Sequence, residues 1–221
     1  MPAKCLSSEP IWTEALRPSA ARPLAAGCTH VDVAVIGGGF TGLSAAYHVL
    51  AAQPSARVIV LEAERVGFGA STRNTGMLTP GVGQSLDSLV RRFGAATARE
   101  MYLASLAAVN YVGELTSREQ IDASLRMTGQ LIVAQGRRGR RRLADQAATL
   151  ESLDLPCERL NDAALRNRLR ICTNAPGGDS QGPAALRLPV AGLLHPGRLI
   201  QGLKDAVERR GGRIVEGAQV V

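Results

Sequence analysis

Two kinds of apolar pattern follow each other early in this chain. Residues 31–36 (VDVAVI) form a short β-branched run that ends in three glycines, and residues 57–61 (RVIVL) form a second run. Continuous apolar runs of this length are typical of buried parallel strands. Between them, small and apolar residues over 40–52 indicate a helix packed on a sheet. The order strand, glycine turn, helix, strand predicts a βαβ unit.

Helical spacing dominates the middle of the chain. Apolar positions predict one helix around 86–93 and a longer one over about 98–115. Residues 129–134 (GQLIVA) predict a strand, and apolar positions over 143–153 mark another helix. Residues 171–190 are rich in proline and glycine, so a loop or an irregular hairpin is expected there.

The two ends of the chain differ in pattern. Residues 1–30 are rich in Pro, Ala and Ser and lack periodicity, which predicts a leader that lies on the surface or is partly disordered. Residues 196–210 are amphipathic, and Pro196 suits the first turn of a helix. After Gly211 and Gly212, residues 213–221 predict a strand that continues to the last residue.

Composition narrows the class of protein. The chain has 45% hydrophobic and 20% charged residues, as globular domains do, and a net charge of +7. Arginine supplies nearly all of the basic residues, and the dense run Arg137–Arg142 is expected to be a solvated turn that opens a helix. Only 3% of the residues are aromatic and the charges are scattered, so a nucleic-acid partner is not expected.

Neither metal nor membrane chemistry is indicated. The histidines have no metal spacing, and His195 is expected to cap the following helix. No apolar stretch approaches the roughly 20 residues of a membrane span or resembles a signal peptide. The cysteines form no CxxC pair, so reduced thiols and a cytoplasmic location are expected. They are Cys5, Cys28, Cys157 and Cys172.

The glycine turn carries the clearest chemistry. Gly37, Gly39 and Gly42 fit G-x-G-x-x-G between the predicted strand and helix. The first glycine allows the tight turn, the second lets the backbone approach a pyrophosphate, and the third permits close packing of helix on strand. The backbone amides around Phe40 and Thr41 would then face the phosphates, where the helix dipole favours negative charge.

An acidic residue, Glu62, occupies the position that dinucleotide-binding motifs of this kind require. Glu62 lies 20 residues beyond Gly42, at the end of the second strand, where a carboxylate accepts hydrogen bonds from ribose hydroxyls. The combination predicts binding of an adenine dinucleotide. The small residues of the loop over 66–77 (VGFGASTRNTGM) would let the backbone approach a ligand, and they favour FAD over NAD.

These residues carry a resemblance. The stretches DVAVIGGGFTGLSAAYH and VLEAERVGFGASTRNTG resemble the amine-oxidising FAD-dependent oxidoreductases of the D-amino-acid oxidase superfamily, most of all its gamma-glutamylputrescine oxidoreductase-like group. The stretch LHPGRL over 194–199 is also similar. The likeness covers 31–80 strongly, 193–221 moderately and the region between them weakly. Thr72 and Thr75 replace the glycines that are commonest in the group's loop.

The resemblance implies a role for particular residues. Phe40 and Thr41 would meet the pyrophosphate and Glu62 the adenosine ribose. Further residues implied to line the cofactor are Ala70 and Ser71 along the phosphates, Thr75, Gly76 and Met77 beside the flavin ring, and Val220 near the adenine. No catalytic residue is nominated.

The resemblance also implies a fold and a domain plan. We expect an α/β protein in which a Rossmann-like FAD/NAD(P)-binding domain (31–80 and 193–221) carries an inserted, incomplete α+β substrate domain (81–192), after a leader over 1–30. Members of the superfamily continue well beyond the point that matches Val221. We therefore expect a truncated protein, whose missing C-terminal half or partner chain would supply most of the catalytic face.

Three functions remain open from the sequence. The first is a flavin enzyme that oxidises an amine or amino acid by hydride transfer. The second is a non-catalytic remnant that binds FAD weakly or not at all. The third is an NAD-dependent dehydrogenase, which would explain the βαβ unit but leave the loop over 66–77 without a role. The sequence does not identify the amine or the electron acceptor.

Overall fold

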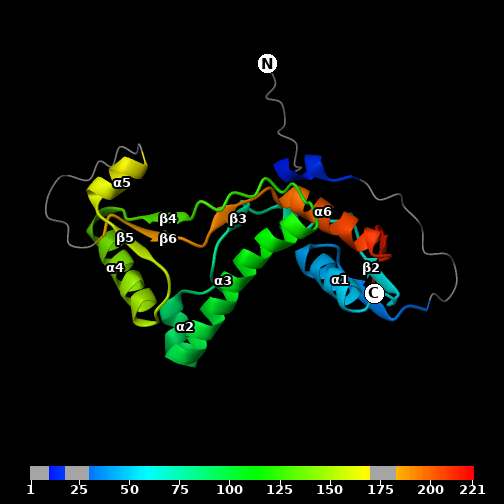
Figure 1. Ribbon diagram of the computed structural model, residues 1–221, viewed down its shortest axis with the longest axis horizontal. Helices are drawn as coiled ribbons and strands as arrows, with labels where there is room; N and C mark the ends of the chain where they lie inside the picture. The colour runs from blue at the N-terminus through cyan, green and yellow to red at the C-terminus, as the bar shows by residue number, and fades with distance from the viewer. Residues whose placement is uncertain (1–9, 18–29, 170–182) are drawn as a thin grey trace, which may run out of the picture. The chain divides into compact units, whose positions relative to one another are not determined.

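The computed structural model describes residues 10–17, 30–169 and 183–221 (Figure 1). Cys5, Cys28 and Cys172 lie outside these ranges, as does most of the expected leader. The chain divides into two compact units. The first comprises Met1–Gly76, Glu114–Leu125 and Leu194–Val221. The second comprises Met77–Gly113 and Arg126–Leu193.

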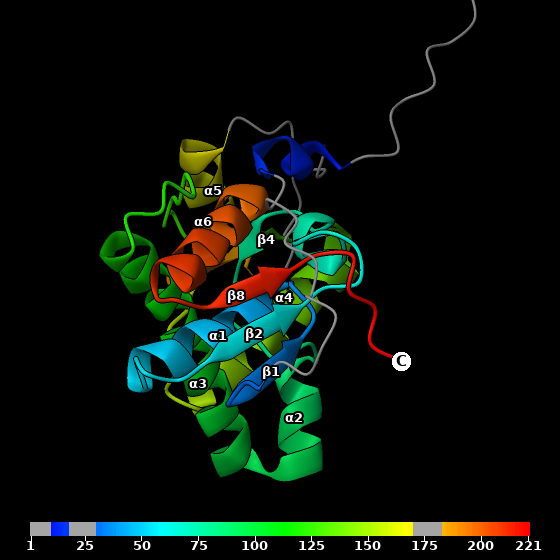
Figure 2. The ribbon, with the colours of Figure 1, turned by 90° about the vertical axis from the view of Figure 1, so that its right-hand side faces the viewer.

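The first unit is built on a three-stranded parallel sheet in the order β1-β2-β8. Strand β1 (Val33–Ile36) leads into helix α1 (Phe40–Ala52), which returns to β2 (Val58–Leu61). Helix α6 (Pro196–Arg209) leads into β8 (Arg213–Val215), which pairs with the other side of β2. Figure 2 shows the three strands side by side. The predicted βαβ unit and Rossmann-like fold are therefore confirmed.

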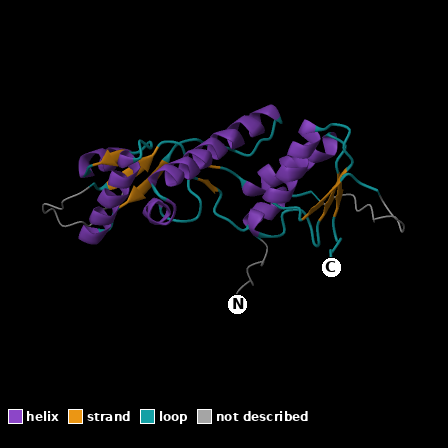
Figure 3. Ribbon diagram, turned by 90° about the horizontal axis from the view of Figure 1, so that it is seen from below, coloured by secondary structure: helices purple, strands orange, loops and turns teal. Residues whose placement is uncertain are grey.

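Helices α1 and α6 pack on each other along the sheet (Figure 3). Leu43, Ala46 and Leu50 of α1 are at most 2% exposed, because the helix presents one small and apolar side to its neighbours. The backbone of α1 approaches β1 closely at Gly42, where a Cβ atom would collide with the carbonyl oxygen of Gly37. The third glycine of the motif is therefore required by packing.

Part of the expected leader has defined structure. Residues Ile11–Ala15 form a short 3₁₀ helix, η1, that contacts α6. A Cβ atom at Gly197 would collide with the backbone carbonyl of Trp12, so the glycine permits this approach. The backbone amide of Arg17 donates to the side-chain oxygen of Gln201 at 2.8 Å. The sequence did not predict η1, because a helix this short is too brief to produce a periodic pattern of apolar residues.

The last strand is shorter than expected. Strand β8 ends at Val215, whereas the sequence predicted a strand that continues to Val221. Gly217 has a φ of +69°, a left-handed conformation that ends an extended run. The amide of Ala218 donates to the carbonyl oxygen of Glu62 at 2.9 Å, so the chain turns beside the end of β2. The prediction over 216–221 was wrong.

The second unit combines helices with two small antiparallel sheets. The helices are α2 (Leu86–Phe93), α3 (Ala95–Arg118), which reaches into the residues of the first unit, α4 (Gly136–Ser152) and α5 (Asp162–Arg168). One sheet has the order β4-β6-β5, formed by Gln130–Val133, Ala185–Leu188 and Glu158–Leu160. The other pairs β3 (Met77–Leu78) with β7 (Gly192–Leu193).

Strand β6 is the central strand of its sheet, although a loop or irregular hairpin was expected over 171–190. Ala185, Leu186 and Leu188 are at most 5% exposed and belong to the apolar cores of the unit. The sequence did not predict this four-residue strand, because the prolines and glycines around it indicate a loop. The part of that prediction that falls on 170–182 lies outside the described residues.

The arginine run is not a turn. It lies inside α4, which begins at Gly136, and Arg140 is only 7% exposed. The guanidinium of Arg140 contacts the carboxylate of Asp162 on α5 at 2.6 Å and holds the pKa of that carboxyl below its ordinary value. The run opens a helix, as expected, but it is not solvated throughout, because Arg140 points inward to a carboxylate 22 residues further along the chain.

Within the part of the chain that the structure describes, no helix is both long and apolar enough to cross a membrane. The same residues hold no cluster of three or more His, Cys, Asp or Glu side chains arranged to bind a metal ion.

Candidate functional site

The glycine turn lies between β1 and α1. Gly37 has a φ of +99°, and its amide donates to the carbonyl oxygen of Leu61 at 2.8 Å, which ties the turn to the end of β2. Gly39 caps α1 in an extended conformation and has no side chain to fill the space before the helix. Phe40 and Thr41 follow in the first helical turn, and Thr41 is exposed. The backbone amides at this end of α1 have no acceptor in the helix itself.

Glu62 is half-buried and faces the glycine turn. Its Oε2 atom accepts a hydrogen bond from the amide of Gly38 at 2.6 Å, and its Oε1 atom accepts one from the amide of Glu64 at 3.0 Å. An ionised carboxylate offers about four lone-pair sites, so about two remain available to a ligand. The acid at the end of β2 is therefore held at the turn with spare acceptor capacity.

Gly38, which the sequence did not single out, is a partner of this acid. A Cβ atom at Gly38 would lie 3.2 Å from the Cβ of Glu62 and 3.1 Å from a methyl carbon of Val66. The signal was the run of three consecutive glycines, where the motif itself requires only the outer two.

A second loop comes against the turn. Residues Ala70–Thr72 form the short 3₁₀ helix η2, and the hydroxyl oxygen of Ser71 accepts a hydrogen bond from the amide of Phe40 at 3.0 Å. A Cβ atom at Gly39 would lie 2.9 Å from the same hydroxyl oxygen. Three predicted residues are therefore brought together, Gly39 and Phe40 from the turn and Ser71 from the second loop, and Ala70 precedes Ser71 in η2.

Asn74 organises this second loop, which the sequence analysis did not predict. Its side-chain amide donates to the carbonyl oxygens of Ala70 at 3.1 Å and Ser71 at 2.9 Å. Its side-chain oxygen accepts from the amide of Gly76 at 2.9 Å. Asparagine commonly fixes turns by bonding to nearby backbone groups, so its place in a loop of small residues was the available signal.

The other predicted residues, Thr75, Gly76, Met77 and Val220, form no hydrogen bond with the glycine turn in the described part of the chain. Thr75 is exposed, whereas Gly76 is buried with a φ of +74° and accepts from the amide of Leu194 at 2.9 Å. Met77 opens β3 in the second unit, where it is 51% exposed. Val220 is 47% exposed and lies outside any strand.

A separate charged group links Tyr47 of α1 to Arg210, the C-cap of α6, through Glu119. The hydroxyl of Tyr47 donates to Glu119 at 2.6 Å, and the guanidinium of Arg210 contacts the same carboxylate at 2.7 Å. These hydrogen bonds, that of Arg210 above all, lower the pKa of Glu119 from 4.5 to about 2. Burial and the hydrogen bond to Glu119 raise the pKa of Tyr47. This group stabilises the helix pair and contacts no predicted cofactor residue.

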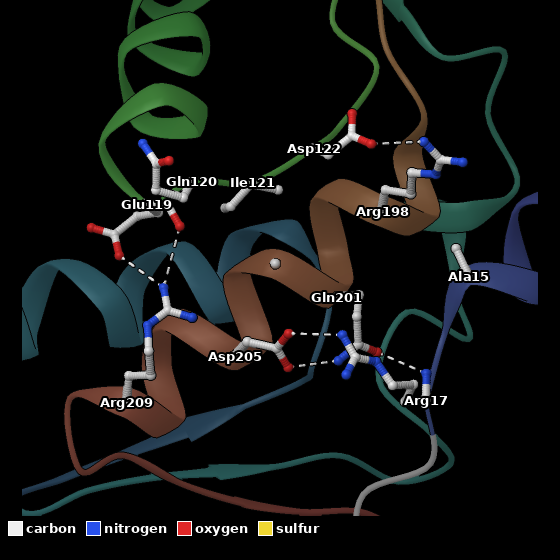
Figure 4. Close-up of a pocket in the computed structure, with 11 residues that line it drawn as sticks. Ala15, Arg17, Glu119, Gln120, Ile121, Asp122, Arg198, Gln201, Asp205 and Arg209 are labelled. Carbon is white, nitrogen blue, oxygen red and sulfur yellow. Dashed lines mark hydrogen bonds and ion pairs between the residues drawn. The ribbon is translucent and has the colours of Figure 1, made fainter.

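His195 caps α6, as the sequence predicted. Its Nδ1 atom accepts a hydrogen bond from the amide of Arg198 at 3.2 Å, and its ring packs edge-on against Trp12. The same region contains a depression of about 300 Å³ (Figure 4). The depression contains none of the predicted cofactor residues, and its charged groups pair among themselves, as Arg198 does with Asp122 at 3.1 Å.

The geometry of the turn fits an adenine dinucleotide. A diphosphate needs backbone amides that its oxygens can reach, and Gly39 has no side chain of its own to cover the first turn of α1. In the structure the amide of Phe40 bonds to a hydroxyl, a group that rotates freely and donates as well as accepts. The fold and this turn define the chain as a Rossmann-like α/β protein of the nucleotide-binding type.

Comparison with known proteins gives the family. Residues 32–221 match the family described as FAD dependent oxidoreductase (DAO), so the chain belongs to that family. It is 35% identical over 185 residues to "Gamma-glutamylputrescine oxidoreductase" of Escherichia coli (strain K12), a match that covers 84% of this chain and 41% of that protein. The expected superfamily and the FAD of its description are therefore confirmed.

Solved structures share the fold. The crystal structure of glycine oxidase from Geobacillus kaustophilus superposes with a TM-score of 0.62 at 22% identity, covering 87% of this chain and 48% of that one. L-amino acid deaminase from Proteus vulgaris also gives 0.62 at 18% identity, covering 87% and 41%. The chain thus spans less than half the length of these relatives.

Proposed function

We propose that this chain forms the FAD-binding part of an oxidoreductase that oxidises an amine or an amino acid. The observation that carries the proposal is the joining of two loops at the start of α1, where Ser71 contacts the amide of Phe40. An NAD-dependent dehydrogenase would use the glycine turn and Glu62 but would leave the second loop without a role. Membership of the FAD dependent oxidoreductase family supports the same choice.

In the proposed site each residue has a physical task. The amides of Phe40 and Thr41 would hold the pyrophosphate, because they start a helix whose dipole favours negative charge. Glu62 would accept from the ribose hydroxyls with the acceptor sites that Gly38 and Glu64 leave available. Ser71 would turn its hydroxyl from the backbone amide to a phosphate oxygen.

The remaining predicted residues complete the proposal. Ala70 would line the phosphates without obstructing them. Thr75, Gly76 and Met77 would run beside the flavin ring, and Val220 would approach the adenine through its backbone. Because Gly76 is held at a φ of +74° by Asn74 and Leu194, the backbone here is fixed before any ligand binds.

Bound FAD supplies the acceptor for the hydride that leaves the carbon beside the substrate nitrogen. The chain's own contribution is to hold and orient the dinucleotide. The relatives named above are more than twice as long as the part they share with this chain, so we expect further polypeptide, from this protein or a partner chain, to contact the small amine substrate. We also propose a cytoplasmic location, because the scattered cysteines of the sequence indicate reduced thiols.

One preparation tests the proposed function. The purified chain is expected to carry a yellow chromophore, measured as flavin absorbance, that bleaches when an amine substrate is added without oxygen. A yellow protein that no amine bleaches would favour the non-catalytic remnant. A colourless protein that binds NADH would overturn the proposal in favour of the dehydrogenase.

A further inference from the structure

Four exposed arginines lie on one face of α4 in the second unit. They are Arg137, Arg138, Arg141 and Arg142, and together we call them the α4 arginine face. Residues spaced i, i+1, i+4 and i+5 share one side of a helix, here over its first two turns. Among the described residues, none of the four has an ion pair or a hydrogen bond from its side chain. Within the described chain, none of these four charges is therefore in direct contact with a carboxylate.

The opposite side of α4 is fixed by packing. Leu143, Ala147 and Leu150 are at most 5% exposed in the apolar core of the unit. Arg140, which lies within the same run, is anchored to Asp162 at 2.6 Å. These contacts define the side of α4 that faces the core, and the arginine face is directed away from it.

The arginines do not serve the stability of α4. Negative charge stabilises the start of a helix, but the first turn of α4 has no acidic residue and its N-cap, Gln135, forms no side-chain cap. Arg137 with Arg141 and Arg138 with Arg142 are like charges at i, i+4, which destabilise a helix. A segment that breaks a local rule without compensation inside the fold commonly marks a functional surface.

We propose that the α4 arginine face docks an acidic segment of a partner protein. Guanidinium groups pair with carboxylates through two parallel hydrogen bonds, and an exposed face made of arginine alone suits that geometry. Carboxylates at helical spacing on the partner would match the two i, i+4 pairs. Binding would also remove the repulsion between the arginines and provide the negative charge that the start of α4 lacks.

Other polyanions fit this face less well. The four residues span about 7.5 Å along the helix axis, shorter than the continuous basic stripe that duplex nucleic acid requires. Helix α4 has no aromatic residue on which single-stranded bases could stack. Its two leucines are buried in the core and its other apolar residues are alanines, so no large apolar side chain is available to insert into a lipid surface.

The test uses the full chain and needs no bound FAD, so its outcome is independent of the proposed function. Labelled poly-L-glutamate is the probe for the acidic partner, and its binding is followed by fluorescence anisotropy at low salt and at about 0.15 M salt. The double variant Arg138→Gln/Arg142→Gln is compared with Arg91→Gln/Arg92→Gln on α2. The control removes the same net charge from exposed positions outside this face.

We expect the α4 variant to weaken binding about tenfold and the α2 variant to change it by less than about twofold. Circular dichroism should show both variants folded. An equal loss of poly-L-glutamate affinity in the two variants would overturn the proposal, because it would show that net charge alone determines binding. Tighter binding of duplex DNA or phosphatidylserine vesicles than of poly-L-glutamate, lost in the α4 variant, would overturn the assignment of the partner.

Discussion

The hydroxyl oxygen of Ser71 lies 3.0 Å from the backbone nitrogen of Phe40, 31 residues earlier in the chain, and accepts its hydrogen bond. Helix α1 has a glycine at its N-cap, which has no side chain to satisfy the first amides. Ser71 provides the missing acceptor from another loop. In the proposed function a phosphate oxygen of FAD would take its place.

Replacing Ser71 therefore has two expected effects. Ser71→Ala should lower the stability of the FAD-free chain by about 1 kcal/mol, because one amide loses its acceptor. It should also weaken FAD binding, because a hydroxyl that contacts the phosphate is lost. Urea unfolding and flavin fluorescence titration measure the two effects. Ser71→Thr keeps a hydroxyl and serves as the control; full FAD affinity in Ser71→Ala would contradict the role given to Ser71.

Gly42 provides a test of the packing between α1 and β1. A Cβ atom there would collide with the carbonyl oxygen of Gly37, so Gly42→Ala should destabilise the chain by about 1–3 kcal/mol. Gly69 has nothing within 4 Å of the position of a Cβ and a φ of −77°, so Gly69→Ala is the matched control. Chemical denaturation measures the free energy of unfolding of both variants. Equal stabilities would show that helix and strand do not approach as described.

Glu119 should make the stability of the chain depend on acid. Hydrogen bonds from Arg210 and Tyr47 hold its pKa at about 2, below its ordinary value of 4.5. A depressed carboxyl pKa stabilises the fold above the unfolded value, and that stability is lost as the pH falls from about 4.5 toward 2. Glu119→Gln should cost about 3 kcal/mol near neutral pH, because it leaves the arginine without its partner.

The pH dependence separates this role from a general loss of packing. In Glu119→Gln the free energy of unfolding should fall less steeply between about pH 4.5 and pH 2 than in the parent chain. Glu114 is exposed, and Glu114→Gln should leave both the stability and its acid dependence unchanged. An identical slope in the Glu119 variant and the parent would contradict the assignment.

Neighbouring arginines of α4 should behave differently on substitution. Arg140 is 7% exposed and paired with Asp162, whereas Arg141 is exposed without a partner among the described residues. Arg140→Ala should destabilise the chain by about 3 kcal/mol, and Arg141→Ala should have no effect or raise its stability slightly. Thermal unfolding of the two variants is sufficient; similar losses in both would contradict the inward position of Arg140.

Strong periodic signals in the sequence predicted the elements that position the site. The run over 31–36, the glycines and the run over 57–61 predicted β1, α1 and β2, because buried parallel strands and their turn leave a direct composition signal. Pro196 and the amphipathic pattern predicted α6. Elements that depend on distant contacts were missed. Strand β6 exists because it pairs on both sides with strands from elsewhere in the sequence.

The same limit applies within the candidate site. Glu62 and the motif glycines were nominated by their spacing, and the structure brings Glu62 to Gly38. The bond from Phe40 to Ser71 could not be predicted, because spacing within one motif says nothing about the loop that packs against it. The three loop contacts of Asn74 were missed for a different reason, since a short polar residue in such a loop has many local partners.

The central claim is that a dinucleotide lies across Gly39 at the start of α1, and one comparison tests it most directly. FAD is titrated into the parent chain, Gly39→Val and the control Gly69→Val, with flavin fluorescence as the readout and circular dichroism to verify folding. We predict saturable binding to the parent and the control and none to the folded Gly39→Val variant. FAD binding by Gly39→Val with the affinity of the parent would contradict the account.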